Sequence, residues 1–575
     1  MLLPSIQPRI SLCSSSESNL HLIFVDSNFT TLQIMSAPAL DEEERSIVIV
    51  GAGFAGIAIA IKLKGAGFKN FKIIEKADDV GGTWRDNTYP GCTSDISIHY
   101  YTLSTDLRSD WNRTCETQPS IQAYIKKLFK KYELESHTCF NSRLLSAKWA
   151  PSLQGYEIVI ENSKRNHRNT IFANILVSAH GLLHIPKLPA IPGLNDFTGK
   201  VMHTAQWDRS VELRQKRVAV IGSGGSGTQV VAKISQLPHT EVVHFIHSPN
   251  WILPASIVTI HRLWKWIFGH VPFVMRLYRW TLFWIFEFLY LLIFKHRITR
   301  NPLRKLAEYF KTSQSPKEFH SFLVPSYPLG CRRIVFDDGY LASLNQENVS
   351  LCNGGEIVSA VPHGLVTKNG NVQHFDVIVC ATGFETVQFP YELRGVRSTI
   401  QEYYDAKDGP EAYLGTTVPG FPNFYMLNGP NTATGYTSVL FFCETEVNYI
   451  MKLIQPVLQN RVSSFEVTQE ANDIYNKKLQ KMLDGTIFTF CGSWYRVGSN
   501  GKNISIFPGS ALTFWYWCRN ANWDHYKVGG PTSSRKAAEP KLSMMWSKSV
   551  TVYVVLGLVV TAWTSWVLHD VASQQ

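Results

Sequence analysis

Two glycine clusters in this chain have the spacing that binds the pyrophosphate of a dinucleotide. Each follows a short apolar run and precedes a segment that can form a helix, as in a βαβ nucleotide-binding unit. Backbone N–H groups at such a helix N-terminus bind phosphate. Two bound dinucleotides indicate electron transfer between them. The clusters are Gly51, Gly53 and Gly56, and Gly222, Gly224 and Gly227.

An acidic residue completes the first unit. Glu75 follows the predicted strand Phe71–Ile74, about 20 positions after the glycines, where a carboxylate accepts hydrogen bonds from a ribose. We therefore expect FAD at the first cluster and a nicotinamide dinucleotide at the second. The residue that selects the phosphorylated form is expected near the end of the next strand, at 245–249.

Two further motifs lie between the glycine clusters. Gly81–Asp95 reads GGTWRDNTYPGCTSD and comes directly after the ribose-binding strand, which places it near a flavin. Phe197–Asp208 reads FTGKVMHTAQWD and comes shortly before the second cluster. By composition alone, the first of these motifs could be an ordinary loop.

With these motifs the chain resembles the Baeyer–Villiger monooxygenases, a class of flavin-dependent monooxygenases, and their fungal members most. The family's GGTW loop matches Gly81–Asp95, including Thr83 and Trp84, and its ATG segment matches Ala381–Gly383. The resemblance covers about Ile47–Lys527. The family signature FxGxxxHxxxW, followed by Pro or Asp, matches Phe197, Gly199, His203, Trp207 and Asp208.

The resemblance implies a role for each matching residue. Arg333 would be the active-site arginine, because a fixed guanidinium stabilises negative charge on the reacting oxygen, and Asp95 would orient it. Arg332 would face the 2′-phosphate of NADPH, and His203 would belong to a hinge between domains. Where many family members have a second phosphate-binding arginine, this chain has His247, so preference for NADPH rests mainly on Arg332.

The implied reaction is a Baeyer–Villiger oxidation. NADPH reduces FAD, the reduced flavin reacts with O2, and one oxygen atom is inserted next to a ketone carbonyl, giving an ester or lactone. We expect a lipophilic ketone, such as a terpenoid, steroid or polyketide of fungal secondary metabolism. Two alternatives stay open: an N- or S-oxygenating flavin monooxygenase, and a catalytically silent, membrane-tethered nucleotide-binding protein. No metal site is expected.

The elements that position these residues predict an α/β fold with two Rossmann-like domains, the NADP domain inserted in the FAD domain. Strands are expected at Ser46–Val50, Phe71–Ile74, Tyr156–Ile160, Thr170–Ser178, Arg217–Ile221, Val242–His247 and Asp376–Phe384. Helices are expected at Ile57–Leu63, Pro119–Tyr132, Gly227–Leu237 and Val439–Leu453. The last of these follows Gly429–Ser438, which resembles the family segment whose helix N-terminus points at the flavin.

The predicted domains follow from the same pattern. They are a disordered leader at 1–44, the first part of the FAD domain at 45–185, the NADP domain at 186–374 with a helical insertion at about 261–325, the second part of the FAD domain with the substrate pocket at 375–527, a linker at 528–548 and a transmembrane helix at 549–568. Aromatic residues Trp494, Tyr495, Phe514, Trp515 and Trp517 are candidate pocket walls, although core packing is the commoner role for such residues.

Composition narrows the class of protein. A hydrophobic content of 45% with 18% charged residues is typical of a globular protein. The net charge of +11 fits anionic lipid or cofactor phosphate, and the chain has no nucleic-acid-binding motif. The ten cysteines have no regular spacing, so we expect reduced, mostly buried thiols and a cytosolic location.

Two segments point to a membrane. Ser549–Leu568 contains no charged residue and is long enough to cross a bilayer as a helix, with basic residues before it. We therefore expect a single-pass anchor, in the endoplasmic reticulum, with the catalytic domain in the cytosol. His261–Lys305 is strongly aromatic but contains Arg276, Arg279 and Glu287, so it is interpreted as an insertion that packs on the core or touches the membrane.

Overall fold

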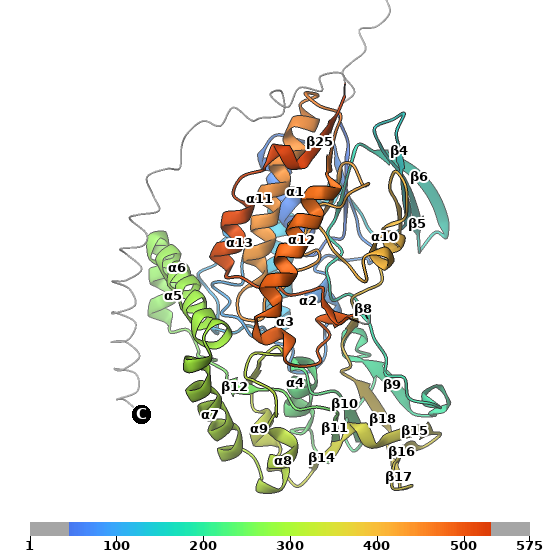
Figure 1. The fold of residues 1–575 in the computed structure, drawn as a ribbon. Coiled ribbons are helices and arrows are strands. Elements are labelled where there is room, and N and C mark those ends of the chain that lie inside the picture. The colour runs from blue at the N-terminus through green and yellow to red at the C-terminus, as the bar shows by residue number, and fades with distance from the viewer. Residues whose placement is uncertain (1–44, 499, 531–575) are drawn as a thin grey trace, which may run out of the picture. The chain divides into compact units, whose positions relative to one another are not determined.

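The computed structural model describes residues 45–498 and 500–530. The expected leader at 1–44, the expected transmembrane helix at 549–568 and nearly all of the expected linker at 528–548 lie outside these residues. In the described part, two five-stranded parallel sheets each carry one glycine cluster (Figure 1).

The first sheet forms around the apolar run that precedes Gly51. All four residues of β1 (Ile47–Val50) are buried, as expected for a parallel strand that is covered on both faces. Helix α1 (Phe54–Gly65) starts directly after the glycine turn and packs against α11 (Val439–Leu458). The strand order is β21 (Phe424–Met426), β7 (Ile175–Ser178), β1 (Ile47–Val50), β2 (Phe71–Ile74) and β3 (Thr138–Cys139).

The second sheet repeats this arrangement around Gly222. Helix α4 (Gly225–Ile234) follows the glycine turn and ends three residues before the expected Leu237. The strand order is β14 (Val349–Asn353), β11 (Glu241–Ile246), β10 (Arg217–Ile221), β18 (Val377–Cys380) and β9 (Lys200–His203).

The place of β18 corrects one expected boundary. We expected the chain to return to the FAD domain at 375, but β18 pairs in parallel with β10 and β9 of the second sheet. A buried strand that ends on a glycine turn has the same local sequence pattern in both sheets. Only its pairing with neighbouring strands shows to which sheet it belongs. The chain returns beyond this strand, where β20 (Glu392–Arg394) joins a third sheet and β21 joins the first.

The third sheet corrects a second expectation. The predicted strand Thr170–Ser178 is two strands, because the chain leaves one sheet near Asn174 and enters the other. Asn174 contributes to the change of sheet, since its side-chain oxygen accepts a hydrogen bond from Ser46 N. The order is β20, β4 (Ser142–Ala150), β5 (Gly155–Asn162) and β6 (His167–Ala173).

Helices form the insertion after β12 (Ile252–Pro254) and lie along one side of the molecule in Figure 1. A π-helical turn, η4 (Tyr290–Lys295), continues α6, and its Ile293 and Phe294 lie beside Gly330, three residues before Arg333. The helices are α5 (Arg262–His270), α6 (Pro272–Leu289), η4 (Tyr290–Lys295), α7 (Arg297–Ser313), η5 (Lys317–Phe319) and α8 (His320–Leu323).

The remaining elements cover the sheets or connect them. The helices are α2 (Thr83–Asp86), α3 (Gln118–Lys131), α9 (Tyr340–Ser343), α10 (Ile400–Ala406), α12 (Gln469–Asp484) and α13 (Ala511–Cys518), with short turns η1 (Glu135–His137), η2 (Leu194–Asp196), η3 (Thr204–Gln206), η6 (Gly354–Glu356), η7 (Ile487–Thr489) and η8 (Trp523–His525). The strands are β8 (Ile185–Pro186), β13 (Val335–Asp337), β15 (Ile357–Val361), β16 (Gly364–Thr367), β17 (Val372–His374), β19 (Phe384–Glu385), β22 (Ser464–Val467), β23 (Arg496–Val497), β24 (Lys502–Asn503) and β25 (Tyr526–Gly529).

Candidate active site

The first and third glycines of each cluster are required by close backbone contacts. Gly51 and Gly222 have φ values of 103° and 120°, in the region that L side chains rarely adopt. A Cβ on Gly56 would lie 1.9 Å from the carbonyl oxygen of Gly51, and one on Gly227 would lie 2.0 Å from that of Gly222. These four glycines therefore allow the tight turn and the close approach of helix to strand.

The middle glycines have a different environment. A Cβ on Gly224 would meet no atom within 4 Å, and one on Gly53 would come no closer than 3.7 Å, to Gly82. Gly224 therefore faces open space, and Gly53 has only the backbone of Gly82 at contact distance. Both precede a helix N-terminus, where backbone N–H groups and the helix dipole favour an anion. Each turn therefore fits the pyrophosphate of a dinucleotide, with the missing side chain leaving room for it.

Glu75 is buried at the end of β2, and its carboxylate makes hydrogen bonds within the protein in addition to the ribose contact that we predicted. Its carboxylate accepts hydrogen bonds from the backbone N–H of Ala52 at 2.8 Å and of Ala77 at 3.0 Å. Arg85 donates to it at 2.8 Å. A carboxylate has about four acceptor positions, so it can still bind a ribose hydroxyl. Through Ala52, Glu75 also holds the glycine turn in place.

The GGTW loop lies directly against the first glycine turn. Gly81 N–H donates to the carbonyl of Ala52 at 3.0 Å. Thr83 is exposed at the start of α2, whereas Trp84 is buried and donates from Nε1 to the hydroxyl of Tyr101 at 3.3 Å. The loop therefore forms one wall of the expected flavin site.

The same loop joins the two nucleotide-binding units. Tyr89 donates from its hydroxyl to Gln229 of α4 at 2.8 Å, and Gln229 donates to the Thr93 hydroxyl at 3.0 Å. Asp95 follows two residues later. The loop thus continues from the first glycine turn to α4 and then to the acid that we expected to orient Arg333.

Asp95 and Arg333 form an ion pair across 238 residues of sequence. Nη2 and Nε of Arg333 donate to the same oxygen of Asp95, at 2.6 and 3.1 Å. The carboxylate raises the pKa of Arg333 further above its ordinary value, so the guanidinium stays charged. The arginine side chain is 45% exposed, which leaves part of the group accessible to a ligand.

Aromatic hydroxyls lie near this ion pair. Tyr495 is buried, and burial raises its pKa to about 12. Burial likewise raises the pKa of Tyr101 to about 12, so both hydroxyls stay protonated at neutral pH. Arg333 also approaches the carbonyl of Thr434, at 3.5 Å, just before the N-terminus of α11. Thr434 lies four residues before Ser438, the N-cap of α11.

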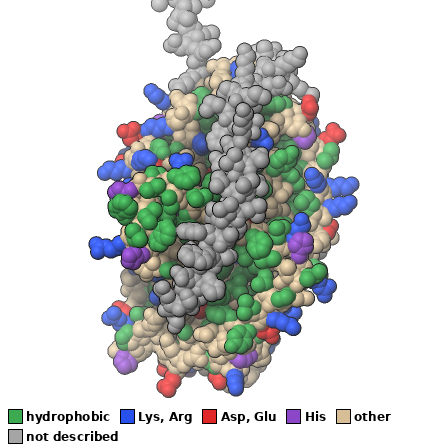
Figure 2. Space-filling model, turned by 90° about the vertical axis from the view of Figure 1, so that its left-hand side faces the viewer, with side chains coloured by type: hydrophobic (Ala, Val, Ile, Leu, Met, Phe, Trp, Pro, Cys, Tyr) green, Lys and Arg blue, Asp and Glu red, His purple; other side chains and the backbone are tan. Residues whose placement is uncertain are grey.

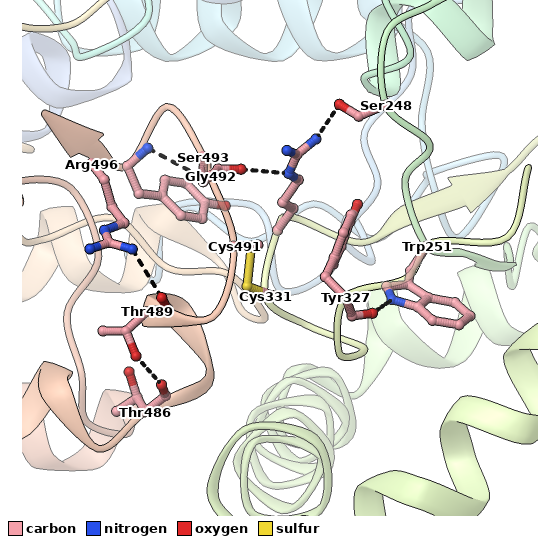
Figure 3. The surroundings of a disulfide bond; sticks show 12 residues. Ser248, Trp251, Tyr327, Cys331, Thr486, Thr489, Cys491, Gly492, Ser493 and Arg496 are labelled. Atoms are coloured by element: carbon pink, nitrogen blue, oxygen red, sulfur yellow. Dashed lines mark hydrogen bonds between the residues drawn. A yellow bond between two sulfur atoms is a disulfide. The ribbon is translucent and has the colours of Figure 1, made fainter. Parts of the chain in front are cut away.

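Arg332 lies in the loop before β13 and reaches Ser248, which follows β11, the second strand of the second nucleotide-binding unit. It donates from Nη1 to the Ser248 hydroxyl at 2.6 Å and from Nε to the carbonyl of Gly492 at 2.7 Å (Figure 3). Its guanidinium also lies 5.0 Å from the ring centroid of Tyr327. His247 is exposed in the same turn.

A disulfide fixes the loop that carries the two arginines. Cys331 is bonded to Cys491, with 6.2 Å between the Cα atoms, and Cys491 precedes the Gly492 that binds Arg332 (Figure 3). The expectation of reduced thiols is wrong for this pair, because a separation of 160 residues leaves no local spacing signal. The other cysteines of the described residues are free.

The signature Phe197–Asp208 forms the edge of the second sheet and the turn that follows. Phe197 is buried, and Gly199 is required because a Cβ would lie 2.4 Å from the carbonyl of Asp376. Hydrogen bonds from Lys200 and Ser210 lower the pKa of Asp208 to about 2, with Lys200 Nζ at 2.7 Å. These residues therefore hold the segment together.

His203 occupies the carboxyl end of β9, beside the ATG segment. It is paired with Cys380 in the sheet, and its ring packs on Phe384 with 5.6 Å between centroids. Burial lowers its pKa, so it is neutral at pH 7. Trp207 directly follows η3 and is half-buried. The position at the edge between sheet and connection is compatible with the expected hinge.

The candidate pocket walls separate into different environments. Phe514 is fully buried and stacks on Phe442 at 4.5 Å, so it is a core residue. Trp517 is half-buried and packs on Phe507 of the core at 5.4 Å. Trp515 is half-buried under Arg519. Of the five, Tyr495 lies near Arg333, with the exposed Trp494 beside it.

Sequence reasoning missed several residues that build the site. Arg85 and Gln229 make contacts that depend on distant segments, and no motif in the chain marks them as partners. Ser248 was within the stretch considered for phosphate selection, but its contact with Arg332 required the fold. Tyr101 carries no local signal.

Comparison with known proteins agrees with this geometry. A family model described as flavin-binding monooxygenase-like matches residues 44–261. A Baeyer–Villiger monooxygenase of Pseudomonas aeruginosa is 33% identical over 477 residues, which cover 81% of this chain and 88% of that protein. An FAD-binding monooxygenase of Aspergillus niger is 31% identical over 86% of this chain and 84% of its own length.

The fold has the same relatives. The crystal structure of a cyclohexanone monooxygenase from Rhodococcus, bound to NADP+, superposes with a TM-score of 0.74 at 25% identity, over 84% of this chain and 99% of that one. The sequence signature, the paired nucleotide-binding turns and these similarities agree. The chain belongs to the Baeyer–Villiger monooxygenase family of flavin-dependent monooxygenases.

Proposed function

We propose that this protein uses NADPH and O2 to insert one oxygen atom next to the carbonyl of a lipophilic ketone. The observation that carries the proposal is the Arg333–Asp95 ion pair, whose carboxylate follows the loop that links the first glycine turn to α4. The names of the Pseudomonas relative and of the NADP+-bound cyclohexanone monooxygenase support the reaction and the nicotinamide cofactor.

The two glycine turns would bind the cofactors. Gly51, Gly53 and Gly56 with Glu75 would hold FAD, and Gly222, Gly224 and Gly227 with Arg332 would hold NADPH. Bound FAD supplies the redox chemistry, because it accepts hydride from NADPH and activates O2 when reduced. Arg332 would contribute a charged donor for the 2′-phosphate, in the place where it now binds Ser248.

Arg333 would stabilise negative charge that develops during oxygen transfer. Its charge is fixed by Asp95, and part of the guanidinium is accessible. A preorganised cation beside the reacting carbonyl stabilises the oxyanion of the addition step more than it stabilises the neutral ketone. The segment that leads into α11 approaches Arg333 through the Thr434 carbonyl, so the positive end of that helix dipole would add to the potential there.

We also propose a membrane location for this activity. The uncharged segment Ser549–Leu568, preceded by Arg535, Lys536, Lys541 and Lys548, favours a single-pass anchor with the catalytic part on the cytosolic side, in the endoplasmic reticulum. The cytosolic orientation is inferred from these basic residues and not from the state of the cysteines, because Cys331 and Cys491 form a disulfide. A membrane-bound enzyme has ready access to ketones that partition into lipid, such as terpenoids, steroids and polyketides of secondary metabolism.

The test is isotopic labelling with detergent-solubilised, FAD-loaded protein. The enzyme is mixed with NADPH, 18O2 and a panel of lipophilic ketones and sulfides, and the products are analysed by mass spectrometry. The variant is Arg333→Ala, and the matched control is Arg165→Ala, which changes an exposed arginine in the turn between β5 and β6.

One labelled oxygen in an ester or lactone, lost in Arg333→Ala and kept in Arg165→Ala, is the expected result. Labelled sulfoxide with every ketone unchanged would assign the protein to heteroatom oxidation. If correctly folded protein neither retained flavin nor oxidised NADPH, the result would favour a catalytically silent nucleotide-binding protein. Unchanged ester formation in Arg333→Ala would refute the role of that residue.

A further inference from the structure

Helix α6 presents an apolar stripe to the outside of the protein. The stripe residues recur every three or four positions, which places them on one face of a helix. Phe273, Trp280 and Phe288 are 68%, 47% and 60% exposed, and Leu277 and Trp284 between them are half-buried. A surface helix of a globular protein normally directs such residues into the core. We call Phe273, Leu277, Trp280, Trp284, Phe288 and Leu291 the outer stripe.

Two of the three charged residues of the same helix, Arg279 and Glu287, point inward, whereas Arg276 is exposed. Arg279 donates to the carbonyls of His99 and Tyr100 at 3.0 and 3.1 Å and lies 3.5 Å from Glu444. Glu287 is buried and accepts hydrogen bonds from the Tyr436 hydroxyl at 2.9 Å and from Ala511 N–H at 3.0 Å. The polarity of α6 is therefore reversed relative to an ordinary surface helix.

The neighbouring helices extend the apolar surface. In α5, Leu263 and Trp266 are each 57% exposed, and in α7, Ile298, Leu306 and Tyr309 are 87%, 62% and 70% exposed. Figure 2 shows hydrophobic side chains gathered on this face of the molecule, with basic side chains around them. Exposed apolar surface of this extent on a folded protein indicates a binding surface.

The positive charge of the same segment indicates an anionic binding partner. Between 262 and 311 the exposed charged residues are all basic, and the acidic Glu287 and Glu308 are buried and half-buried. Tryptophans with lysines and arginines are the residues that favour the interface of an anionic bilayer. The exposed basic residues are Arg262, Arg276, Lys295, Arg297, Arg304 and Lys305.

Two other arrangements fit less well. Pro272–Lys295 is long and apolar enough to cross a membrane by length and composition, but its inward contacts through Arg279 and Glu287 hold it against the nucleotide-binding part. A helix held in this way lies on a membrane surface instead of spanning it. The sequence 531–548 is basic, so it offers no opposite charge to this face.

We propose that α5, α6 and α7 form a monotopic membrane-binding face, with the outer stripe in the acyl boundary of an anionic bilayer. The inner side of this face reaches the active site. Phe294 of η4 packs on Tyr436 with 5.7 Å between ring centroids, and Tyr436 is two residues from Thr434, whose carbonyl faces Arg333. A ketone dissolved in the bilayer would therefore contact the outer side of the α6–η4 helix, whose inner side packs on the segment that reaches Arg333.

The test maps lipid contacts on the full chain. Protein is bound to vesicles of phosphatidylcholine with phosphatidylserine that contain a diazirine phospholipid, irradiated, and its peptides are analysed by mass spectrometry. The variant is Phe273→Asp/Phe288→Asp, which places charge on two exposed positions without changing the core. The control is Ile474→Asp, at a residue of α12 that is 62% exposed. Circular dichroism and flavin content verify folding.

We expect lipid adducts on peptides covering 263–291, reduced roughly tenfold in the double variant and unchanged in the control. Adducts on this face should also decrease in vesicles of phosphatidylcholine alone. Adducts confined to 549–568 would overturn the proposal, because the tail alone would then hold the protein. Concentration-dependent self-association that protects 263–291 without lipid would also overturn it, in favour of a second copy as partner.

Discussion

Removing the disulfide tests how the loop of Arg332 is held. Cys331 precedes Arg332 in sequence, and Cys491 precedes the Gly492 carbonyl to which Arg332 donates at 2.7 Å. The double variant Cys331→Ser/Cys491→Ser leaves this hydrogen bond possible but no longer ties the two segments together. We expect it to lose stability and to bind NADPH more weakly.

The magnitude follows from the length of chain that the bond closes. Closing a loop of 160 residues removes about 17 cal/mol/K of entropy from the unfolded chain, or about 5 kcal/mol at 25 °C. This is the upper end of what native disulfides contribute, so we expect a loss of roughly 2–5 kcal/mol in the free energy of unfolding. Weaker positioning of Arg332, at about 1 kcal/mol for one hydrogen bond, would raise KM for NADPH roughly fivefold.

The assay has two parts. Thiols are titrated in denaturant before and after reduction, and the wild type should gain two thiols that the double variant does not gain. Unfolding in urea and KM for NADPH are then measured with and without reductant. The control is Cys352→Ser, which removes a half-buried free thiol and should respond to reductant as the wild type does.

Two results would refute the reasoning. An equal thiol count before and after reduction in the wild type would show that the bond does not form. A confirmed bond whose removal leaves both unfolding and KM unchanged would show that it neither stabilises the fold nor positions Arg332.

Three further predictions concern other parts of the site. Arg332→Ala should raise KM for NADPH roughly 10- to 100-fold, because the 2′-phosphate would lose a charge-assisted hydrogen bond, while KM for NADH stays constant. An equal rise of KM for both nucleotides would contradict a contact with the 2′-phosphate. Glu75→Gln should lower the free energy of unfolding of FAD-free protein by about 3 kcal/mol, because Ala52, Ala77 and Arg85 all donate to the carboxylate. If only the affinity for FAD changed, Glu75 would bind the ligand without stabilising the fold. His244 is a buried residue of β11, and its Nε2 lies 2.9 Å from the carbonyl oxygen of Gly222. Burial lowers its pKa to about 4, so the unfolded chain binds more protons between about pH 6.5 and pH 4. Stability should therefore decrease as pH falls through that window, by up to about 3 kcal/mol, and urea unfolding of His244→Gln should lack this part of the pH dependence.

Some of the fold and site is visible in local sequence. The glycine turns, Glu75 and the helices behind them depend on spacing within about 30 residues, which is the size of one βαβ unit. The signature Phe197–Asp208 is equally local, and its glycine is required by a backbone contact. Strand pairing is not local, which is why the expected return to the first domain at 375 and the single strand at 170–178 were wrong.

The sequence by itself therefore determined two dinucleotide-binding units and a family of flavin-dependent monooxygenases, because these depend on residue types at short, fixed spacing. The resemblance implied the pairing of Asp95 with Arg333, and the tertiary structure gave its geometry across 238 residues. The tertiary structure alone brought Cys331 to Cys491, across 160 residues. It also decided which side of α6 faces outward. Periodicity shows that a helix has an apolar stripe, but the direction of that stripe depends on the partners of its charged residues, here Glu444 and Tyr436.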